Sequence, residues 1–224
     1  MNDFIGFIPL RGGSKGIKNK NIKDLNGKPM CYYSICALQN SRYIKKVVVS
    51  TDCDKIKAVV LSFNFNKVEI FERSSKNASD TASSESAILE YLKSDNILKN
   101  NFLFFCQATS PLLTPDIVND AIKKFQKCNY DSMVSVVEFT RFFWDQDSNP
   151  INYDPKSRPR RQEMKTNYVE NGAFYISKNE QILDTECRIS GKIGLFEMPL
   201  NTIIEIDELK DFKLITNILK YAEN

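Results

Sequence analysis

The strongest constraint on the fold is an alternation of short apolar runs with helical patterns along most of the chain. Residues 4–8 (Phe-Ile-Gly-Phe-Ile) are continuously apolar, as expected for a strand buried on both faces. Further strands are predicted at 47–49, 67–71, 102–106, 132–137, 173–176, 196–199 and 202–206. Helices are predicted from Pro29 to about residue 38, at 55–61, 82–93 and 115–127, and from about residue 208. This alternation indicates an α/β fold with a doubly wound, mainly parallel sheet.

The length of 224 residues suits one domain over 1–224, since α/β domains often exceed 200 residues. Residues 139–167 break the regular pattern, because they are rich in Arg, Asp, Asn and Pro and carry Phe142, Phe143 and Trp144 together. This stretch is either a long surface loop or an arm that packs on a second subunit. Aromatic side chains beside arginines are enriched at interfaces, which favours a dimerisation arm.

The chain contains no histidine, and this excludes several kinds of chemistry. Ser-His-Asp and Cys-His nucleophile pairs, His-ligated zinc sites and 2-His-1-carboxylate iron centres all need imidazole. Any acid–base or metal chemistry must therefore use carboxylates, lysines, hydroxyls or thiols. The six cysteines form no CxxC motif, and several lie in apolar segments, so we expect free and mostly buried thiols.

The overall charge and hydropathy argue against two classes of partner. A net charge of +3 is too small by itself to indicate nucleic-acid binding. No segment approaches the roughly 18 apolar residues of a membrane helix, and the apolar start is too short for a signal peptide. We therefore expect a cytoplasmic protein that binds neither nucleic acid nor membrane.

Basic side chains are concentrated near the N-terminus, in and after a glycine-rich loop. Residues 4–23 contain five basic side chains and no acidic one. The loop 10–16 (Leu-Arg-Gly-Gly-Ser-Lys-Gly) follows the first strand, at the edge of the sheet where α/β proteins bind ligands. Its glycines let backbone amides approach an anion, which favours a polyphosphate site over a solvated turn. The spacing matches neither the P-loop GxxxxGK[ST] nor the dinucleotide fingerprint GxGxxG.

Several motifs in order give the chain a specific likeness to one family. The motifs are 8–17 (IPLRGGSKGI), 20–22 (KNI), 25–29 (LNGKP), 50–52 (STD), 78–84 (ASDTASS), 107–112 (QATSPL), 160–162 (RRQ), 170–173 (ENGA) and 206–207 (ID). Over nearly its whole length the chain resembles the acylneuraminate cytidylyltransferases, which include CMP-sialic acid synthetases and enzymes for related nine-carbon sugar acids. The resemblance implies a nucleotide-diphospho-sugar transferase-like, Rossmann-type fold. It also implies transfer of CMP from CTP to the anomeric hydroxyl of a 2-keto sugar acid, with release of pyrophosphate.

The resemblance also implies how the nucleotide is bound. The triphosphate would be held by residues near the N-terminus, namely Arg11, Gly12, Ser14, Lys15, Lys20 and Asn21. Arg73 and Ser84 match positions that contact the cytosine and its surroundings. Fixed cations suit this reaction because negative charge gathers on the phosphoryl oxygens in the transition state. Arg11, Lys20 and Asp207 would be the catalytic residues.

For the sugar acid, the resemblance implies contacts from Gln107, Arg161 and Asn171. A guanidinium suits a carboxylate because its donors match the two oxygens. The residues alone leave other interpretations open. Ser84 could be a helix cap, Gln107 a turn-stabilising amide, and Arg161 one of several surface arginines.

Two carboxylates near the C-terminus are the expected magnesium ligands. Glu205 and Asp207 follow an apolar run and would face the same side of a strand over 202–206. Mg²⁺ typically takes one or two carboxylates together with nucleotide phosphates and water. The family commonly has two aspartates here, so Glu205 is a departure and could act through water. A solvated or ion-paired carboxylate pair is the alternative interpretation.

The resemblance leaves the sugar and the assembly less defined. Gly16-Ile17 follows the sialic and legionaminic acid branch, so an N-acetylneuraminate or legionaminate type ranks first and a pseudaminate type second. Another sugar nucleotidyltransferase and a non-catalytic nucleotide-binding module are further alternatives. A homodimer is implied, in which the arm 139–167 contacts the neighbouring subunit and brings Arg141 towards its site.

Overall fold

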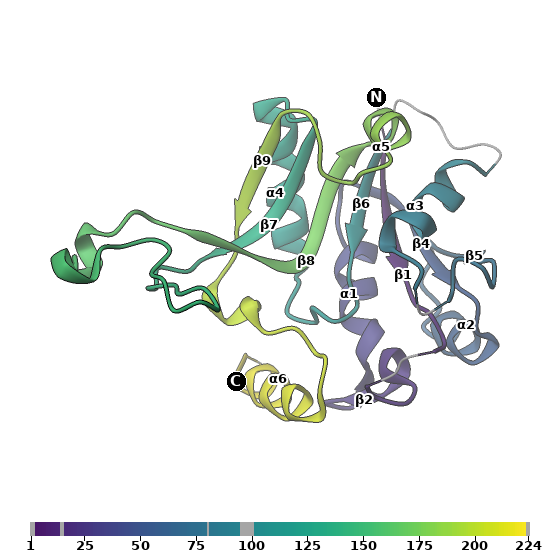
Figure 1. The fold of residues 1–224 in the computed structure, drawn as a ribbon. Helices are drawn as coiled ribbons and strands as arrows, with labels where there is room; N and C mark the ends of the chain where they lie inside the picture. Colours follow the sequence, from purple (N-terminus) through teal and green to yellow (C-terminus); the bar gives the residue numbers. More distant parts are fainter. Residues whose placement is uncertain (1–2, 14–15, 80, 95–100, 223–224) are drawn as a thin grey trace.

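A seven-stranded sheet forms the centre of the molecule (Figure 1). The computed structural model describes residues 3–13, 16–79, 81–94 and 101–222. In sheet order the strands are β5 (Val68–Glu72), β4 (Ile44–Thr51), β1 (Phe4–Pro9), β6 (Phe102–Cys106), β8 (Tyr168–Lys178), β7 (Ser132–Glu138) and β9 (Ile193–Glu197). β8 is antiparallel to β6 and β7, and the other neighbouring pairs are parallel. The predicted mainly parallel sheet is confirmed. A separate two-stranded sheet pairs β2 (Asp24–Leu25) with β3 (Lys28–Pro29).

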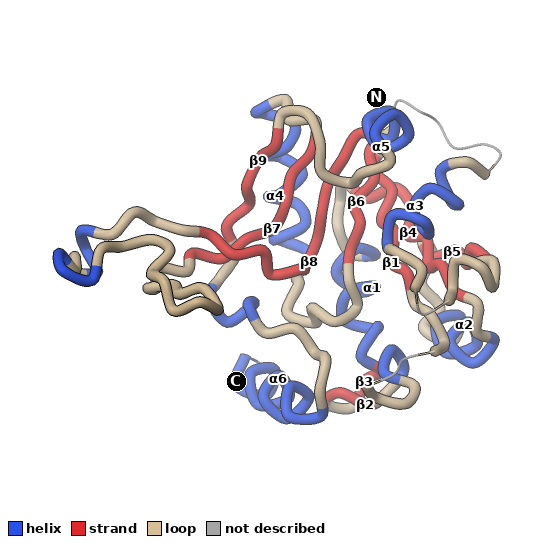
Figure 2. The backbone as a smooth tube through the Cα atoms, in the orientation of Figure 1, coloured by secondary structure: helices blue, strands red, loops and turns tan. Residues whose placement is uncertain are grey.

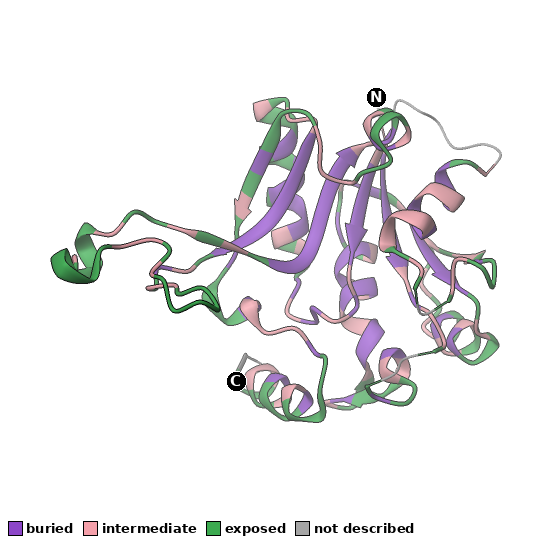
Figure 3. Cartoon of the chain, viewed as in Figure 1, coloured by how far each residue is buried: buried purple, intermediate pink, exposed green. Residues whose placement is uncertain are grey.

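Helices cover both faces of the sheet (Figure 2). Buried side chains of α1 (Met30–Gln39), α2 (Asp54–Leu61), α4 (Pro115–Cys128) and α6 (Leu209–Ala222) belong to the core on one face. Buried side chains of α3 (Ser84–Leu92) and α5 (Asn179–Thr185) belong to the core on the other. The central strands are therefore buried on both sides (Figure 3), as a doubly wound sheet requires.

The alternation of side chains along β1 divides its residues between the two cores. Phe4 and Ile8 lie in the core beneath α1 and α4, whereas Ile5 and Phe7 lie in the core beneath α3. Gly6 lies between them, where a Cβ atom would come 2.8 Å from Leu38 Cδ1 of α1. A glycine at this position thus allows α1 to pack closely on the strand.

Hydroxyl side chains cap the N-termini of α3 and α4. Thr114 Oγ1 accepts a hydrogen bond from Ile117 N at 3.3 Å, and Pro115 occupies the first position of α4. This confirms the predicted start of α4. Ser83 Oγ accepts a hydrogen bond from Ser86 N at 3.1 Å at the start of α3.

The predicted strand over 202–206 is wrong. Leu200–Ile203 forms a short 3₁₀ helix, and the segment continues without regular structure to residue 207. Its β-branched composition favours a strand. Its backbone, however, hydrogen-bonds to a loop and not to the edge of a sheet, since Ile206 N donates to Thr109 O at 3.0 Å. α5 was not predicted, because its seven residues are too short for a clear helical pattern.

Residues 139–167 leave the sheet between β7 and β8 and extend away from it as an arm (Figure 1). The arm contains two short 3₁₀ helices, Pro155–Ser157 and Arg161–Glu163, and a single bridge between Trp144 and Pro150. Arg158 lies over the ring of Phe142, with its guanidinium carbon 4.0 Å from the ring centroid. The predicted departure from regular structure is confirmed.

All six cysteines lie in the described residues and are free. Cys31 and Cys106 are buried, and burial raises the pKa of each thiol to about 12. Cys187 is exposed and the other three are partly buried, so the expectation of mostly buried thiols holds for two of the six. Within the described ranges, every helix is too short or too polar to cross a membrane.

Candidate active site

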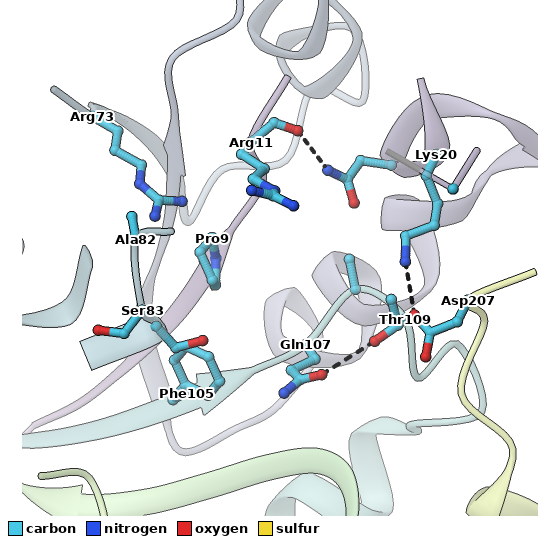
Figure 4. A pocket seen from close by; sticks show the side chains of 14 residues that line it. Pro9, Arg11, Lys20, Arg73, Ala82, Ser83, Phe105, Gln107, Thr109 and Asp207 are labelled. Atoms are coloured by element: carbon cyan, nitrogen blue, oxygen red, sulfur yellow. Dashed lines mark hydrogen bonds and ion pairs between the residues drawn. The ribbon is translucent and has the colours of Figure 1, made fainter. Parts of the chain in front are cut away.

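A cavity of about 460 Å³ lies at the carboxyl ends of β1 and β6 (Figure 4). Loops that follow parallel strands meet at this edge of an α/β sheet, which is where ligands bind. Seven residues predicted from the sequence line the cavity: Arg11, Lys20, Asn21, Arg73, Ser84, Gln107 and Asp207. The fold thus brings together side chains that come from six separate stretches of the chain.

The loop after β1 is fixed by side chains on either side of it. Gly12 N donates to Asp52 Oδ1 at 2.9 Å, and Asn21 Nδ2 donates to Arg11 O at 3.0 Å. A Cβ atom at Gly12 would lie 2.9 Å from Cys53 Cβ, so the glycine lets the loop pack against the end of β4. Ser14 and Lys15, both predicted to bind phosphate, lie outside the described residues.

Lys20 joins this loop to the segment before α6. Its Nζ donates to Asp207 Oδ1 at 3.0 Å (Figure 4) and to Ile206 O at 3.0 Å. The lysine side chain is 18% exposed and the aspartate side chain 72% exposed, so the cation is held by the protein while the carboxylate faces the cavity opening. One fixed positive charge and one accessible negative charge therefore lie together at this end of the cavity.

Two guanidinium groups also line the cavity: Arg73 lies at the end away from Lys20 and Asp207, and Arg11 lies between Arg73 and Lys20 (Figure 4). Arg11 Nη1 donates to Ser79 O at 3.3 Å. Arg73 is only 9% exposed, and its buried Nε makes no hydrogen bond to any described residue. Burial lowers the pKa of Arg73, while the nearby carboxylates of Asp52 and Glu90 act in the other direction. A buried guanidinium with an unused donor suits an acceptor-rich ligand.

The serines at the start of α3 have separate functions. Ser83 supplies the helix cap, as described above, and Ser84 is the first residue of α3 and lines the cavity beside it. The interpretation of Ser84 as a helix cap is therefore wrong. Its place in the cavity lining agrees with the predicted nucleotide contact.

Gln107 follows β6 and is tied to the sheet through its backbone. Gln107 N donates to Ala173 O at 3.2 Å, and its carbonyl accepts from Ser34 Oγ at 3.2 Å. Its side-chain Oε1 accepts from Thr109 Oγ1 at 3.3 Å, and its Nε2 makes no hydrogen bond to any described residue. The amide is thus held from one side and retains donors for a ligand in the cavity.

Glu205 lies near Asp207 and completes an acidic group beside the cavity. Burial raises the pKa of the Glu205 carboxyl, the negative charge of Asp207 raises it further, and Lys20 lowers it. Among the described residues, no cluster of three or more His, Cys, Asp or Glu side chains is able to hold a metal. Two carboxylates beside cationic side chains nevertheless fit Mg²⁺, which takes most of its other ligands from phosphate and water.

Two predicted sugar contacts do not line this cavity. Arg161 lies on the arm, where it borders a second cavity of about 410 Å³ together with Glu138 and Thr140. Asn171 is 1% exposed, and its Nδ2 donates to Thr202 Oγ1 at 2.9 Å. Within one chain, Asn171 therefore ties β8 to a neighbouring segment, and Arg161 lies outside the cavity described above.

The pattern of a cationic loop, a buried arginine and paired carboxylates agrees with the comparison with known families. A family model described as "Cytidylyltransferase" matches residues 5–224. The chain belongs to the cytidylyltransferase family.

Named members of this cytidylyltransferase family include sugar-acid enzymes from vertebrates and bacteria. The chain is 35% identical over 207 residues to N-acylneuraminate cytidylyltransferase A of Danio rerio, covering 89% of this chain and 47% of that protein. It therefore spans about half the length of that relative. It is 30% identical over 223 residues to pseudaminic acid cytidylyltransferase of Campylobacter jejuni subsp. jejuni serotype O:2, covering 95% of this chain and 94% of that protein.

A solved structure with the same fold is that of CMP:2-keto-3-deoxy-manno-octonic acid synthetase complexed with CTP. Its TM-score to the present chain is 0.71 at 15% sequence identity, covering 99% of this chain and 100% of that one. A likeness at this low identity demonstrates the shared fold. The expected nucleotide-diphospho-sugar transferase-like architecture is confirmed.

The sequence did not single out three residues that build this cavity. Asp52 holds Gly12, Phe105 forms part of the cavity wall, and Thr109 holds both Gln107 and Ile206. Asp52 and Thr109 follow β4 and β6 closely, and the carboxyl ends of parallel strands meet at one edge. Their positions just after two predicted strands could therefore have indicated that they lie near the site.

Proposed function

We propose that the protein transfers CMP from CTP to the anomeric hydroxyl of a nine-carbon 2-keto sugar acid and releases pyrophosphate. The hydroxyl oxygen attacks the α-phosphorus, the bond from that phosphorus to the bridging oxygen of pyrophosphate breaks, and the hydroxyl proton is lost to water. The observation that carries the proposal is the convergence in one cavity of Arg11, Lys20, Arg73 and Asp207. Membership of the cytidylyltransferase family supports the same reaction.

The roles of the cationic residues follow from their positions. Arg11 lies on the loop after β1 and Lys20 begins the short 3₁₀ helix Lys20–Ile22, and both neutralise the charge that gathers on the phosphoryl oxygens. Arg73 and Ser84 lie together at the α3 end of the cavity and bind the nucleoside portion. Gln107 lies between these ends and contacts the sugar acid (Figure 4).

Mg²⁺ is proposed as the cofactor, held by Asp207 as the main protein ligand and by Glu205. When bound, it screens the phosphate charge and makes the attacking hydroxyl easier to deprotonate. Lys20 keeps Asp207 oriented towards the opening of the cavity, since its Nζ lies 3.0 Å from Asp207 Oδ1. Neither the proposed metal site nor the cationic side chains require imidazole, which agrees with a chain that has no histidine.

The proposed substrate is a sugar acid of the N-acetylneuraminate or legionaminate type. The likeness to the Danio rerio N-acylneuraminate enzyme supports this choice. A pseudaminate-type substrate is the second candidate, and the likeness to the Campylobacter jejuni enzyme, which covers 94% of that protein, favours it.

Pyrophosphate release, measured with each of four nucleoside triphosphates and a panel of sugar acids and sugar phosphates, tests the function. We expect release with CTP and a nine-carbon acid in the presence of Mg²⁺, and mass spectrometry of the CMP-sugar formed from competing acids identifies the substrate. Release with a sugar phosphate and a different triphosphate would indicate another sugar nucleotidyltransferase. CTP binding without release for any acceptor would indicate a non-catalytic nucleotide-binding module.

The protein is further proposed to be a homodimer in which the arm 139–167 packs on the partner subunit. Trp144 is 52% exposed and Ile151 is 64% exposed on this arm, so the arm offers apolar surface to a partner. Because Arg161 lies on the same arm and outside its own cavity, we expect it to reach the cavity of the partner. A monomer in sedimentation velocity at micromolar concentration would contradict the dimer.

Mixing two inactive variants tests the shared site directly. Arg161→Ala and Asp207→Ala each remove one contribution, and heterodimers of the two carry one cavity with both residues intact if Arg161 acts across the interface. We expect activity to return on mixing. Activity that stays absent, in mixtures shown by mass spectrometry to contain heterodimers, would place Arg161 in its own subunit's site.

A further inference from the structure

The carboxylate of Glu205 lies directly against the backbone of Gly172 in β8. Gly172 has φ +64°, a conformation that favours glycine, and a Cβ atom added there would lie 2.5 Å from Glu205 Oε1 and 2.7 Å from Glu205 Cδ. The glutamate side chain therefore occupies the space that any other residue at position 172 would fill. Only glycine satisfies both the backbone conformation and this contact.

The preceding residue, Asn171, fixes the segment that leads to Glu205. Its Nδ2 donates to Thr202 Oγ1 at 2.9 Å, and Thr202 Oγ1 in turn donates to Pro199 O at 2.6 Å. Asn171 Oδ1 accepts from Ala173 N at 3.4 Å, which orients the amide. Since Asn171 is 1% exposed, these contacts use its side chain within the protein.

Beyond Glu205, the same segment is held by two further contacts. Ile206 N donates to Thr109 O, and Ile206 O accepts from Lys20 Nζ, both at 3.0 Å. The backbone is thus fixed on both sides of Glu205. Its carboxylate makes no hydrogen bond or ion pair with any described residue, so its position depends on packing against Gly172.

We propose that Asn171 and Gly172 form a positioning element that sets the place of the Glu205 carboxylate beside Asp207. Asn171 fixes the course of the backbone, and Gly172 provides the surface on which the longer glutamate side chain lies. The inference rests on the proposed function in one respect, which is that the two carboxylates bind a divalent cation. Asn171 then acts through Glu205 and not by touching the sugar acid, in contrast to the expectation from the sequence.

The chain offers a matched control for a test at Gly172. Gly191 has φ +68°, and a Cβ atom added there would lie 2.7 Å from Asp131 Oδ2. Gly172→Ala and Gly191→Ala therefore impose the same backbone strain and the same kind of contact with a carboxylate. Asp131 is bound to Lys178 at 2.6 Å, and neither Gly191 nor Asp131 lines the catalytic cavity.

Mn²⁺ binding to the CTP complex, measured by electron paramagnetic resonance, is the first readout. We expect Gly172→Ala to weaken Mn²⁺ binding about tenfold, because displaced supporting groups typically cost 10–100-fold in metal affinity. The Mg²⁺ concentration for half-maximal activity should rise by a similar factor. Gly191→Ala should change neither value, and equal effects of the two variants would overturn the proposal.

Thermal unfolding without metal or nucleotide provides a readout that is independent of activity. Glu205→Ala removes the group that an added Cβ would contact, so it should raise the melting temperature more in Gly172→Ala than in the wild type or in Gly191→Ala. If Glu205→Ala raised the melting temperature equally in all three backgrounds, Gly172 and Glu205 would not interact. Gly172→Asn provides the same contact if Gly172→Ala does not fold, since asparagine adopts positive φ at four other positions, Asn19, Asn26, Asn64 and Asn129.

The outcomes separate this inference from the proposed function. In one outcome the wild type forms no CMP-sugar, but Glu205→Ala raises the melting temperature more in Gly172→Ala than in the wild type. The contact between Gly172 and Glu205 then stands and the proposed function fails. If the wild type is active but Gly172→Ala binds Mn²⁺ as Gly191→Ala does, the function stands and the positioning role is overturned.

Discussion

Lys20 Nζ lies 3.0 Å from Asp207 Oδ1, although the two residues are 187 positions apart in the sequence. The contact joins the basic loop after β1 to the segment that precedes α6, and it places opposite charges at one end of the cavity. Lys20 also donates to Ile206 O, so it supports the backbone that carries Asp207.

Replacing Lys20 should reduce turnover far more than stability. Lys20→Met removes the cation that neutralises the phosphoryl oxygens, and loss of one such donor typically costs about 10²–10³ in kcat. We expect a loss of this size in a pyrophosphate-release assay, with unfolding by urea changed little. Lys123→Met is the control, because Lys123 lies 2.9 Å from Asp120 in an ion pair on α4 and does not line the cavity. Equal kcat values for the two variants would argue against a role for Lys20 in the reaction.

Replacing Arg73 should weaken nucleotide binding. Arg73→Met removes a buried guanidinium from the α3 end of the cavity, and a hydrogen bond to a charged group is worth about 1.5–3 kcal/mol. The KM for CTP should therefore rise about tenfold to a hundredfold in initial-rate measurements. Arg42→Met, at an exposed position at the other end of β4, should leave it unchanged. An unaltered KM in Arg73→Met would exclude this arginine from the nucleotide site.

The pH dependence of stability should reveal the burial of Glu205. Its pKa is raised, chiefly by burial, so the folded protein binds this proton more readily than the unfolded chain. The favourable contribution is complete below the ordinary pKa of about 4.3 and is lost as the pH rises through the raised value. Relative to Glu205→Gln, the wild type should lose stability as the pH rises from about 4 through that raised value in metal-free urea titrations.

A carboxylate with the opposite shift provides the control for this pH series. The hydrogen bond from Lys178 lowers the pKa of Asp131, so its contribution is present above the ordinary pKa and is lost as the pH falls through the lowered one. Wild type relative to Asp131→Asn should therefore gain stability with rising pH at the acidic end of the range. If the wild type gained stability with rising pH relative to Glu205→Gln as well, the raised pKa of Glu205 would be refuted.

Packing between β1 and α1 should be sensitive to a single methyl group. Gly6→Ala places a Cβ atom 2.8 Å from Leu38 Cδ1, and Leu38 is fully buried. Overpacking of this kind costs about 1–3 kcal/mol in the free energy of unfolding, measured with urea. Gly13→Ala should cost far less, because no atom of the described residues, chain neighbours aside, lies within 4 Å of an added Cβ there. Equal stabilities of the two variants would show that the core relaxes around the added methyl group.

Local patterns were sufficient to predict most of the fold. The apolar run at Phe4–Pro9 and the hydroxyl-proline pair at the start of α4 each indicated their element, because burial and capping are decided by neighbouring residues. The segment 202–206 was mistaken for a strand because β-branched residues suit a strand wherever a partner edge exists. Whether an edge is available depends on residues distant in the sequence.

The candidate site shows the same division between local and distant information. The glycine-rich loop and the acidic pair were recognisable in the sequence, since the residue types themselves suit a polyphosphate and a cation, and the family resemblance pointed to Arg73. The burial of Asn171 against Thr202, the position of Arg161 on the arm and the contact of Glu205 with Gly172 were not. Each depends on which chain segments meet after folding.

The sequence by itself therefore determined most of the order of strands and helices, the family, and the kinds of side chain available for chemistry in a chain without histidine. The tertiary structure decided which of those side chains share one cavity and which only support it. The physical reason is that strand and helix formation responds to neighbours in the sequence, whereas the cavity forms where the ends of several strands converge. Lys20 and Asp207 meet only because the sheet brings the loop after β1 and the segment before α6 to the same edge.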